Sequence, residues 1–200
     1  MSNCLKSGAA LLLAAVLALQ PLSALACTVP DGVTLSENDQ ERMVDFFRSR
    51  SQGLAETLIA PSYNERVDVH ALFAQGDGYI DAIADGDYLC RTVKLGGAIS
   101  PLVVYPYFDC RISKGGTRID KITVSQGFSG RLQSAETAVF YWGALYYGDE
   151  QPIAYGADAD RDQVGCIYRV PDKTAKRYRL ELPYPRYEST HDVIELVRKD

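Results

Sequence analysis

The 200-residue chain contains only two histidines, His70 and His191, and neither stands in a recognisable local motif with a serine or cysteine nucleophile. Cys90 and Cys110 have no companion pair at a zinc-binding spacing. The glycine pairs stand between strand-like runs, not in a phosphate-binding loop. These absences argue against triad hydrolases, zinc enzymes and nucleotide-binding enzymes, so the sequence predicts no catalytic residue, no metal and no cofactor.

The chain also lacks an excess of basic residues. Lys and Arg number 21 against 26 Asp and Glu, which gives a formal net charge of −5. An acidic protein without a basic stripe is poorly suited to nucleic acids or anionic membrane surfaces. The apolar share of 46% is ordinary for a folded protein and argues against disorder. We therefore expect a globular protein with no nucleic acid partner.

Beyond the N-terminus, no long apolar run occurs. The run at residues 9–19 follows Lys6 and precedes the small-x-small sequence Ala24–Ala26, which predicts a signal peptide over residues 1–26. The run is too short to span a bilayer, so we expect no transmembrane segment in the mature chain. Cleavage leaves Cys27 first, and the alternative is a lipoprotein signal with a lipid anchor at Cys27. Both routes predict a periplasmic or secreted protein.

Residues 88–114 predict a β-hairpin, because two apolar-rich runs flank a Gly-Gly turn. If paired positions sum to 200, Cys90 faces Cys110 and Arg91 faces Asp109. Directly opposite residues in a non-hydrogen-bonded pair have Cα atoms about 4.5 Å apart, within disulfide range. We therefore predict a Cys90–Cys110 disulfide.

Cys27 and Cys166 are the other cysteines of the exported chain. One interpretation pairs them with each other, and nothing in their spacing tests it. The other leaves Cys166 as a free buried cysteine, with Val164 and Tyr168 on the same strand face.

Residues 27–86 are expected to form a helical segment. Ser36 is a suitable N-cap, and apolar residues then recur at helical spacing up to the stop at Pro61. Gly53 interrupts this pattern and predicts a kink or a split. A second, shorter helix is expected over residues 65–74.

From residue 87 to residue 200 the apolar period changes to two, as in β-strands. Six strand-like runs follow the two hairpin runs, at 118–124, 127–133, 137–147, 164–170, 176–182 and 192–198. Short connections predict an antiparallel meander, and eight short strands without helices predict a closed barrel-like sheet. A two-sheet sandwich is the alternative. The predicted fold class is α+β, with an N-terminal helical segment and a C-terminal eight-stranded antiparallel barrel-like domain.

The run at 137–147 carries large apolar side chains on both faces. One face would carry Val139, Tyr141, Gly143 and Leu145, and the other Phe140, Trp142, Ala144 and Tyr146. We expect the first face to fill the barrel and the second to lie beneath the helices, against Phe46 and Phe47. The alternative is an open aromatic surface on which Trp142 stacks against a ligand.

Further aromatic residues, Tyr105, Tyr107, Phe108 and Tyr147, fill the core in the simplest interpretation and line a ligand pocket or partner-binding patch in the other. Residues 158–163 carry acids at alternate positions, like the start of a calcium loop. Gln163 stands where such a loop needs glycine, and Arg169 stands where it needs its last acid. We therefore interpret this segment as a solvated acidic turn with Arg161 as its internal partner.

Five motifs resemble those of a secreted proteobacterial family of unknown function: CRTVKLGG, YFDCRI, KITVSQGFSGRL, GALYYGDEQPIAYGADADRDQVG and RLELPYPRYESTHDVIEL. The likeness covers residues 86–198. Such proteins carry a signal peptide, a helical N-terminal part and this cysteine pair, so the resemblance implies export and the Cys90–Cys110 disulfide. It implies no activity, and Cys27 and Cys166 are not part of its pattern.

Charged residues inside these motifs are the candidate binding residues: Arg91, Lys94, Asp149, Glu150, Arg161 and Asp162. Ion pairing at the barrel ends is their alternative role. We expect an exported, non-enzymatic envelope protein that binds a ligand or a protein partner. The alternatives are a hydrolase built on carboxylates near Asp149, Glu150 and Asp162, and a structural subunit of an envelope complex, in which Cys27 would carry a lipid.

Overall fold

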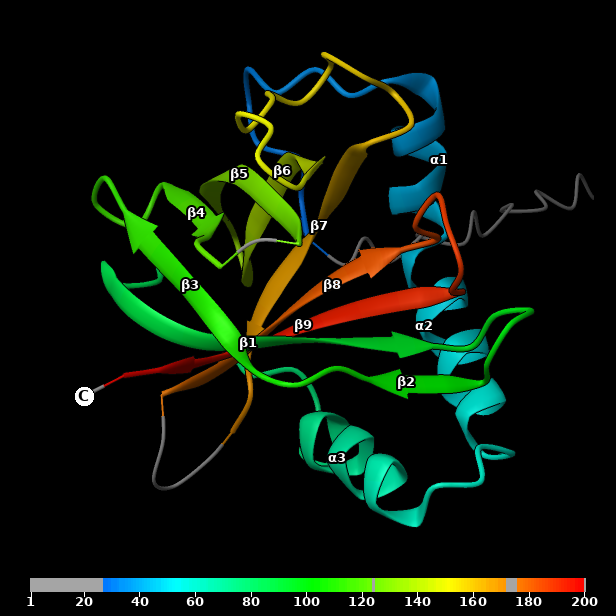
Figure 1. The fold of residues 1–200 in the computed structure, drawn as a ribbon. Helices are drawn as coiled ribbons and strands as arrows, with labels where there is room; N and C mark the ends of the chain where they lie inside the picture. Colours follow the sequence, from blue (N-terminus) through cyan, green and yellow to red (C-terminus); the bar gives the residue numbers. More distant parts are fainter. Residues whose placement is uncertain (1–26, 124, 172–175, 200) are drawn as a thin grey trace, which may run out of the picture.

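The computed structural model describes residues 27–123, 125–171 and 176–199. Within these residues, three helices accompany a closed eight-stranded antiparallel barrel and one extra strand (Figure 1). The predicted α+β class and barrel are confirmed. The predicted signal peptide, residues 1–26, lies outside the described residues.

The helices are α1 (Glu37–Val44), α2 (Phe46–Thr57) and α3 (Tyr63–Phe73). Ser36 caps α1 as predicted, because its hydroxyl oxygen accepts from the backbone N–H of Asp39. The helix divides at Asp45, so the prediction of a break at Gly53 is wrong. A Cβ at Gly53 would lie 3.0 Å from that of His191, so this glycine lets α2 approach the barrel closely.

The strands are β1 (Gly86–Leu95), β2 (Leu102–Val104), β3 (Phe108–Ser113), β4 (Arg118–Lys121), β5 (Gln126–Ala135), β6 (Ala138–Tyr147), β7 (Asp162–Arg169), β8 (Arg177–Pro183) and β9 (His191–Arg198). Each strand from β3 to β9 pairs antiparallel with the next, and β9 pairs with β1 to close the barrel. The predicted meander is therefore correct, and the sandwich alternative is wrong.

The second run of the predicted hairpin is divided into two strands. β2 pairs with the end of β1 from Val93 to Leu95, and β3 pairs with its beginning from Gly86 to Cys90. Pro106 lies in the break, where it supplies no N–H to a ladder. This division explains why the sheet has nine strands, one more than the sequence predicts.

The register of the hairpin also differs from the prediction. Cys90 faces Phe108 instead of Cys110, so the register is shifted by two residues. Because of the same shift, Asp109 faces Leu89 and not Arg91. The disulfide is nevertheless present, because Cys90 and Cys110 are diagonal neighbours on the inner face with Cα atoms 6.0 Å apart. The pairing was predicted correctly from an incorrect register.

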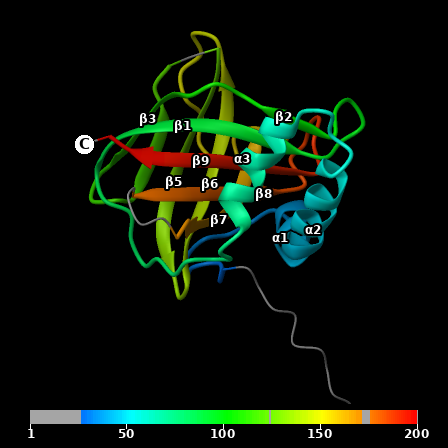
Figure 2. The same cartoon turned by 90° about the horizontal axis from the view of Figure 1, so that it is seen from below.

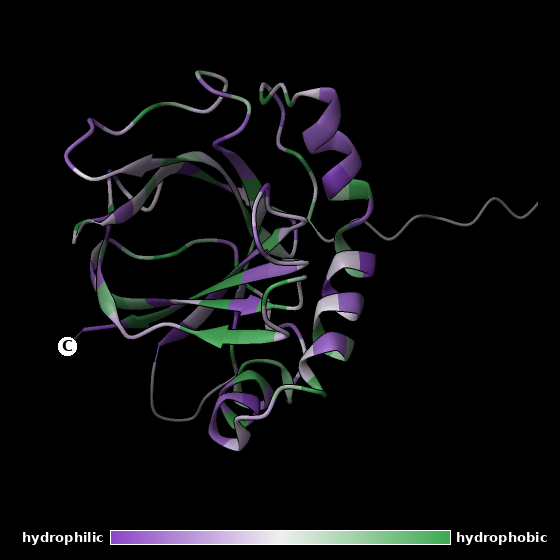
Figure 3. Ribbon diagram, turned by 45° about the vertical axis from the view of Figure 1, so that its right-hand side comes forward, coloured by the Kyte–Doolittle hydropathy of each residue, from purple (hydrophilic) through white to green (hydrophobic). Residues whose placement is uncertain are grey.

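Side chains on the inner face fill one end of the barrel. Tyr88, Ile112 and Leu196 belong to this core, and Ile80 and Ile83, from the segment between α3 and β1, join it. The strands alternate hydrophobic and hydrophilic residues, whereas α1 is mostly hydrophilic (Figure 3). The helices all lie outside the barrel, and α1 and α2 follow one another along one side (Figure 1), where they overlap when seen from below (Figure 2).

A second core lies between the helices and the outer face of β6 and β7. Phe46 and Phe140 are fully buried there, and the Cys27–Cys166 disulfide ties the N-terminal segment to β7. The predicted division of faces on β6 is confirmed for these core residues, because Tyr141 belongs to the inner core and Phe140 to the outer one. Trp142 is only half-buried, and Phe47 stays 37% exposed.

Candidate functional site

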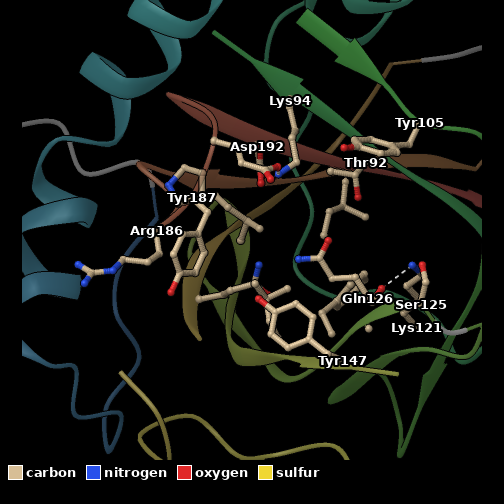
Figure 4. Close-up of a pocket in the computed structure, with 18 of the residues that line it drawn as sticks. Thr92, Lys94, Tyr105, Lys121, Ser125, Gln126, Tyr147, Arg186, Tyr187 and Asp192 are labelled. Carbon is tan, nitrogen blue, oxygen red and sulfur yellow. Dashed lines mark hydrogen bonds and ion pairs between the residues drawn. The ribbon is translucent and has the colours of Figure 1, made fainter. Parts of the chain in front are cut away.

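The other end of the barrel interior is open and encloses a cavity of about 820 Å³, which we call the cup (Figure 4). Apolar side chains from four strands form part of its surface: Phe128, Leu145, Leu182 and Ile194. Polar side chains also line the cavity, among them Thr92, Lys94, Lys121, Gln126, Gln163 and Asp192. The rim includes Tyr105, Tyr147, Arg186, Tyr187 and Glu188.

Tyr141 supports the floor of the cup. Its ring lies over Gly130 and Gly143, where an added Cβ would come within 2.2 Å and 2.6 Å of Tyr141 atoms. Its hydroxyl donates to Oε1 of Gln163, 3.2 Å away, and burial raises the pKa of this phenol. The two glycines thus let the Tyr141 ring pack inside the barrel and reach Gln163, which lines the cup.

Lys94 and Asp192 are directly opposite each other on β1 and β9, and both project into the cup (Figure 4). Nζ of Lys94 donates to Glu188 at 2.7 Å, and Oγ of Ser189 donates to Asp192 at 2.6 Å. Burial by itself would lower the pKa of Lys94. The carboxylates of Asp192 and Glu188 outweigh this effect, so the pKa is raised above its usual value. Burial raises the pKa of Asp192, against the effect of Lys94. Two carboxylates thus share one ammonium in this wall, and each of the three groups has a hydrogen-bond partner.

Lys121 projects into the cup from β4. Its Nζ donates to the carbonyl oxygen of Gln126 and lies 4.0 Å from the centre of the Phe108 ring. Among the described residues no carboxylate forms an ion pair with it. Burial lowers its pKa, because the ammonium is partly removed from water without a counter-charge.

Arg42 closes a gap in the barrel wall beside the cup. β7 and β8 pair only from Cys166 to Arg169, so their ends separate toward the cup. Arg42 lies there, with Nε donating to the carbonyl oxygen of Pro183 and Nη1 to that of Asp162. Nη1 also pairs with Asp39 at 2.6 Å. Its Nη2 is buried and has no hydrogen-bond partner in the described part of the chain.

The six candidate binding residues do not form one site. Lys94 and Asp162 line the cup, and burial raises the pKa of Asp162, whose carboxylate accepts from the N–H of Gly156. Arg91 faces outward instead and pairs with Glu195 at 2.5 Å and Asp68 at 3.0 Å.

The other three candidates lie on the connection between β6 and β7. Glu150 pairs with Arg161 at 2.5 Å, and Arg161 lies 5.0 Å from the centre of the Tyr147 ring. Asp149 is exposed. None of the three belongs to the described lining of the cup. Glu150 and Arg161 thus form a surface ion pair outside the cup lining, and no ion pair of Asp149 is found among the described residues.

Sequence reasoning missed a chain of hydrogen bonds between Ser49, His191 and Glu181. Ser49 Oγ lies 2.9 Å from Nδ1 of His191, and Nε2 of the same ring lies 3.0 Å from Glu181. Although these residue types match a catalytic triad, all three are 0% exposed, so no substrate reaches the serine. They come from α2, β8 and β9, and no local motif could have connected them.

The charge of Glu181 is compensated within this cluster. Burial alone would raise its pKa, but the hydrogen bond from His191 and the charges of Arg50 and Arg179 lower it to about 2. Among the described residues, no group of three or more His, Cys, Asp or Glu could hold a metal ion. No helix in the described ranges is long and apolar enough to cross a membrane.

The fold and the cavity define a closed antiparallel barrel with a cup of ligand size. The chain belongs to the family described as Domain of unknown function (DUF4893), whose model matches residues 33–196. The match includes all three helices, so the family likeness extends beyond the barrel motifs. No curated protein and no solved structure matches the chain. The two disulfides suggest an oxidising, extracytoplasmic environment.

Proposed function

We propose that this protein is an exported, non-enzymatic binding protein of the bacterial envelope that holds a small ligand in the cup. The cup carries this proposal. Its volume of about 820 Å³ falls in the range of about 300–1,000 Å³ that is usual for small-molecule sites. Eight-stranded barrels are wide enough to hold one small ligand when their side chains leave space. The apolar floor and polar wall suit an amphipathic molecule.

Three observations support this function over its alternatives. The carboxylates suggested for a hydrolase are divided, because Asp162 lines the cup whereas Asp149 and Glu150 do not. A lipid anchor and the Cys27–Cys166 disulfide need the same sulfur, so the disulfide gives no support to a lipoprotein subunit. The disulfides and the N-terminal signal pattern favour export. A protein partner would use the tyrosine-bearing rim and leave the cup unfilled.

The test is a fluorescence titration of the mature protein with N-phenyl-1-naphthylamine, an uncharged apolar probe. Thr92 faces the cup, whereas Leu89 faces outward from the same strand and is 39% exposed. Thr92→Trp should place an indole ring inside the cup and weaken saturable binding, while Leu89→Trp should leave binding unchanged. The function would be overturned if the wild type did not bind the probe, or if Thr92→Trp bound it normally.

A further inference from the structure

The carboxylates of the cup wall already have donors. Asp192 accepts from Ser189 and lies opposite Lys94, and Glu188 accepts from Lys94. Asp162 accepts from a backbone N–H, and Asp160 pairs with Arg186 at 3.0 Å. A cationic ligand would have to compete with these internal partners, so the acids do not form a vacant cation site.

The charged donors of the wall are less completely satisfied. An ammonium group has three N–H donors, and Lys121 uses one on the carbonyl oxygen of Gln126. The face of the Phe108 ring attracts this ammonium group, but no described carboxylate forms an ion pair with it. Arg42, which also lines the cup, contributes a buried Nη2 without a partner. Arg42, Lys94 and Arg186 each have a carboxylate partner, so Lys121 is the cation of the cup lining without an ion pair among the described residues.

An apolar surface lies within the same cavity. Phe128 and Leu145 are on β5 and β6, the strands that follow β4 around the barrel, and Ile194 lies on β9. A ligand whose head group reached Lys121 could therefore lay its body on apolar side chains. One molecule would then accept hydrogen bonds from the free donors and also cover the apolar surface of the cup.

We propose that the ligand is an amphipathic anion, with one carboxylate or phosphate group that accepts hydrogen bonds from Nζ of Lys121 and an apolar body on the floor of the cup. This ligand class rests on the proposed function. A counter-anion also explains why a partly buried lysine is kept in the wall without an internal acid. Lys121 then determines the preference for anionic ligands. The apolar floor contributes affinity for the body of the ligand, whatever the charge of its head group.

The experiment displaces N-phenyl-1-naphthylamine from the cup with four ligands of equal chain length, each below its micelle concentration. These are dodecanoate, dodecyl phosphate, dodecan-1-ol and dodecyltrimethylammonium. A charge-assisted hydrogen bond is worth about tenfold or more in affinity, so one or both anions should bind at least about tenfold more tightly than the alcohol. The stronger of the two anions identifies the head group.

Lys121→Met keeps the length of the side chain and removes its charge. It should reduce the preference for anions over the alcohol to within about threefold, and Lys121→Arg should restore the preference. The matched control is Lys176→Met, which removes an exposed lysine near the filled end of the barrel. The ligand class would be wrong if the alcohol or the cation bound as tightly as the anions, or if Lys121→Met kept the preference. Normal probe binding in those cases would leave the proposed function intact, whereas absence of probe binding would overturn both.

Discussion

Arg42 on α1 donates a hydrogen bond from Nε to the carbonyl oxygen of Pro183 at the end of β8, 3.0 Å away. Its Nη1 donates to the carbonyl oxygen of Asp162 at the start of β7. The side chain of a helix thus replaces the strand-to-strand bonds that are lost where β7 and β8 separate. The integrity of the barrel beside the cup therefore depends on the helical segment.

Arg42→Met should lower the free energy of unfolding by about 3–5 kcal/mol, because it removes the counter-charge of the buried Asp39 and the donor to two strand carbonyls. Arg48→Met is the matched control, since Arg48 also pairs with an aspartate three residues earlier but its side chain is 71% exposed. Its effect should stay within about 1 kcal/mol. Urea denaturation measures both, and equal losses would contradict the bridging role of Arg42.

The two disulfides should contribute unequally to stability. Cys27 and Cys166 are 139 residues apart, whereas Cys90 and Cys110 are 20 apart. In the chain-entropy model, the longer loop gives about 5 kcal/mol and the shorter about 3 kcal/mol. Replacing each pair with alanines and comparing denaturation midpoints tests the order.

Peptide mapping without reduction should recover both disulfide-linked pairs from exported protein. An intact mass with a diacylglyceryl adduct on Cys27 would contradict the Cys27–Cys166 pair, because both modifications use the same sulfur.

Phe140→Ala should destabilise the protein more than Trp142→Ala, although tryptophan is the larger residue. Phe140 is 0% exposed and packs with Phe46, so the substitution should cost about 3–5 kcal/mol. Trp142 is half-buried at the border of the same core and should cost less. Thermal or urea unfolding of the two variants provides the comparison. A larger loss for Trp142→Ala would place its ring in the interior of this core.

Stability should fall as the pH decreases from about 5 to about 2. The pKa of Glu181 is lowered from 4.5 to about 2 in the folded protein, so the unfolded chain binds more protons in this window. Glu181→Gln should be less stable at pH 7 and should show a weaker dependence on pH between 5 and 2. Glu41→Gln, at an exposed position with no ion pair among the described residues, is the control and should keep the wild-type dependence. Chemical denaturation at a series of pH values measures both, and an unchanged slope in Glu181→Gln would refute this assignment.

The sequence by itself determined the order and type of the elements. Apolar residues with a period of two fix which side chains share a strand face, and this placed Tyr141 and Phe140 in different cores. Short connections between the runs allow only antiparallel neighbours, so the meander was also determined. These properties depend on residues close together in the chain.

Only the tertiary structure decided the register, the division of the helix and the site. Arg91 was expected to face Asp109, but it pairs with Glu195, which is 104 positions away. Lys121 could not be recognised as an uncompensated cation, because that depends on which acids every other strand brings to the cup. The burial of a side chain and its ion pairs depend on contacts with residues that are far away in the sequence. A local sequence pattern therefore cannot predict them.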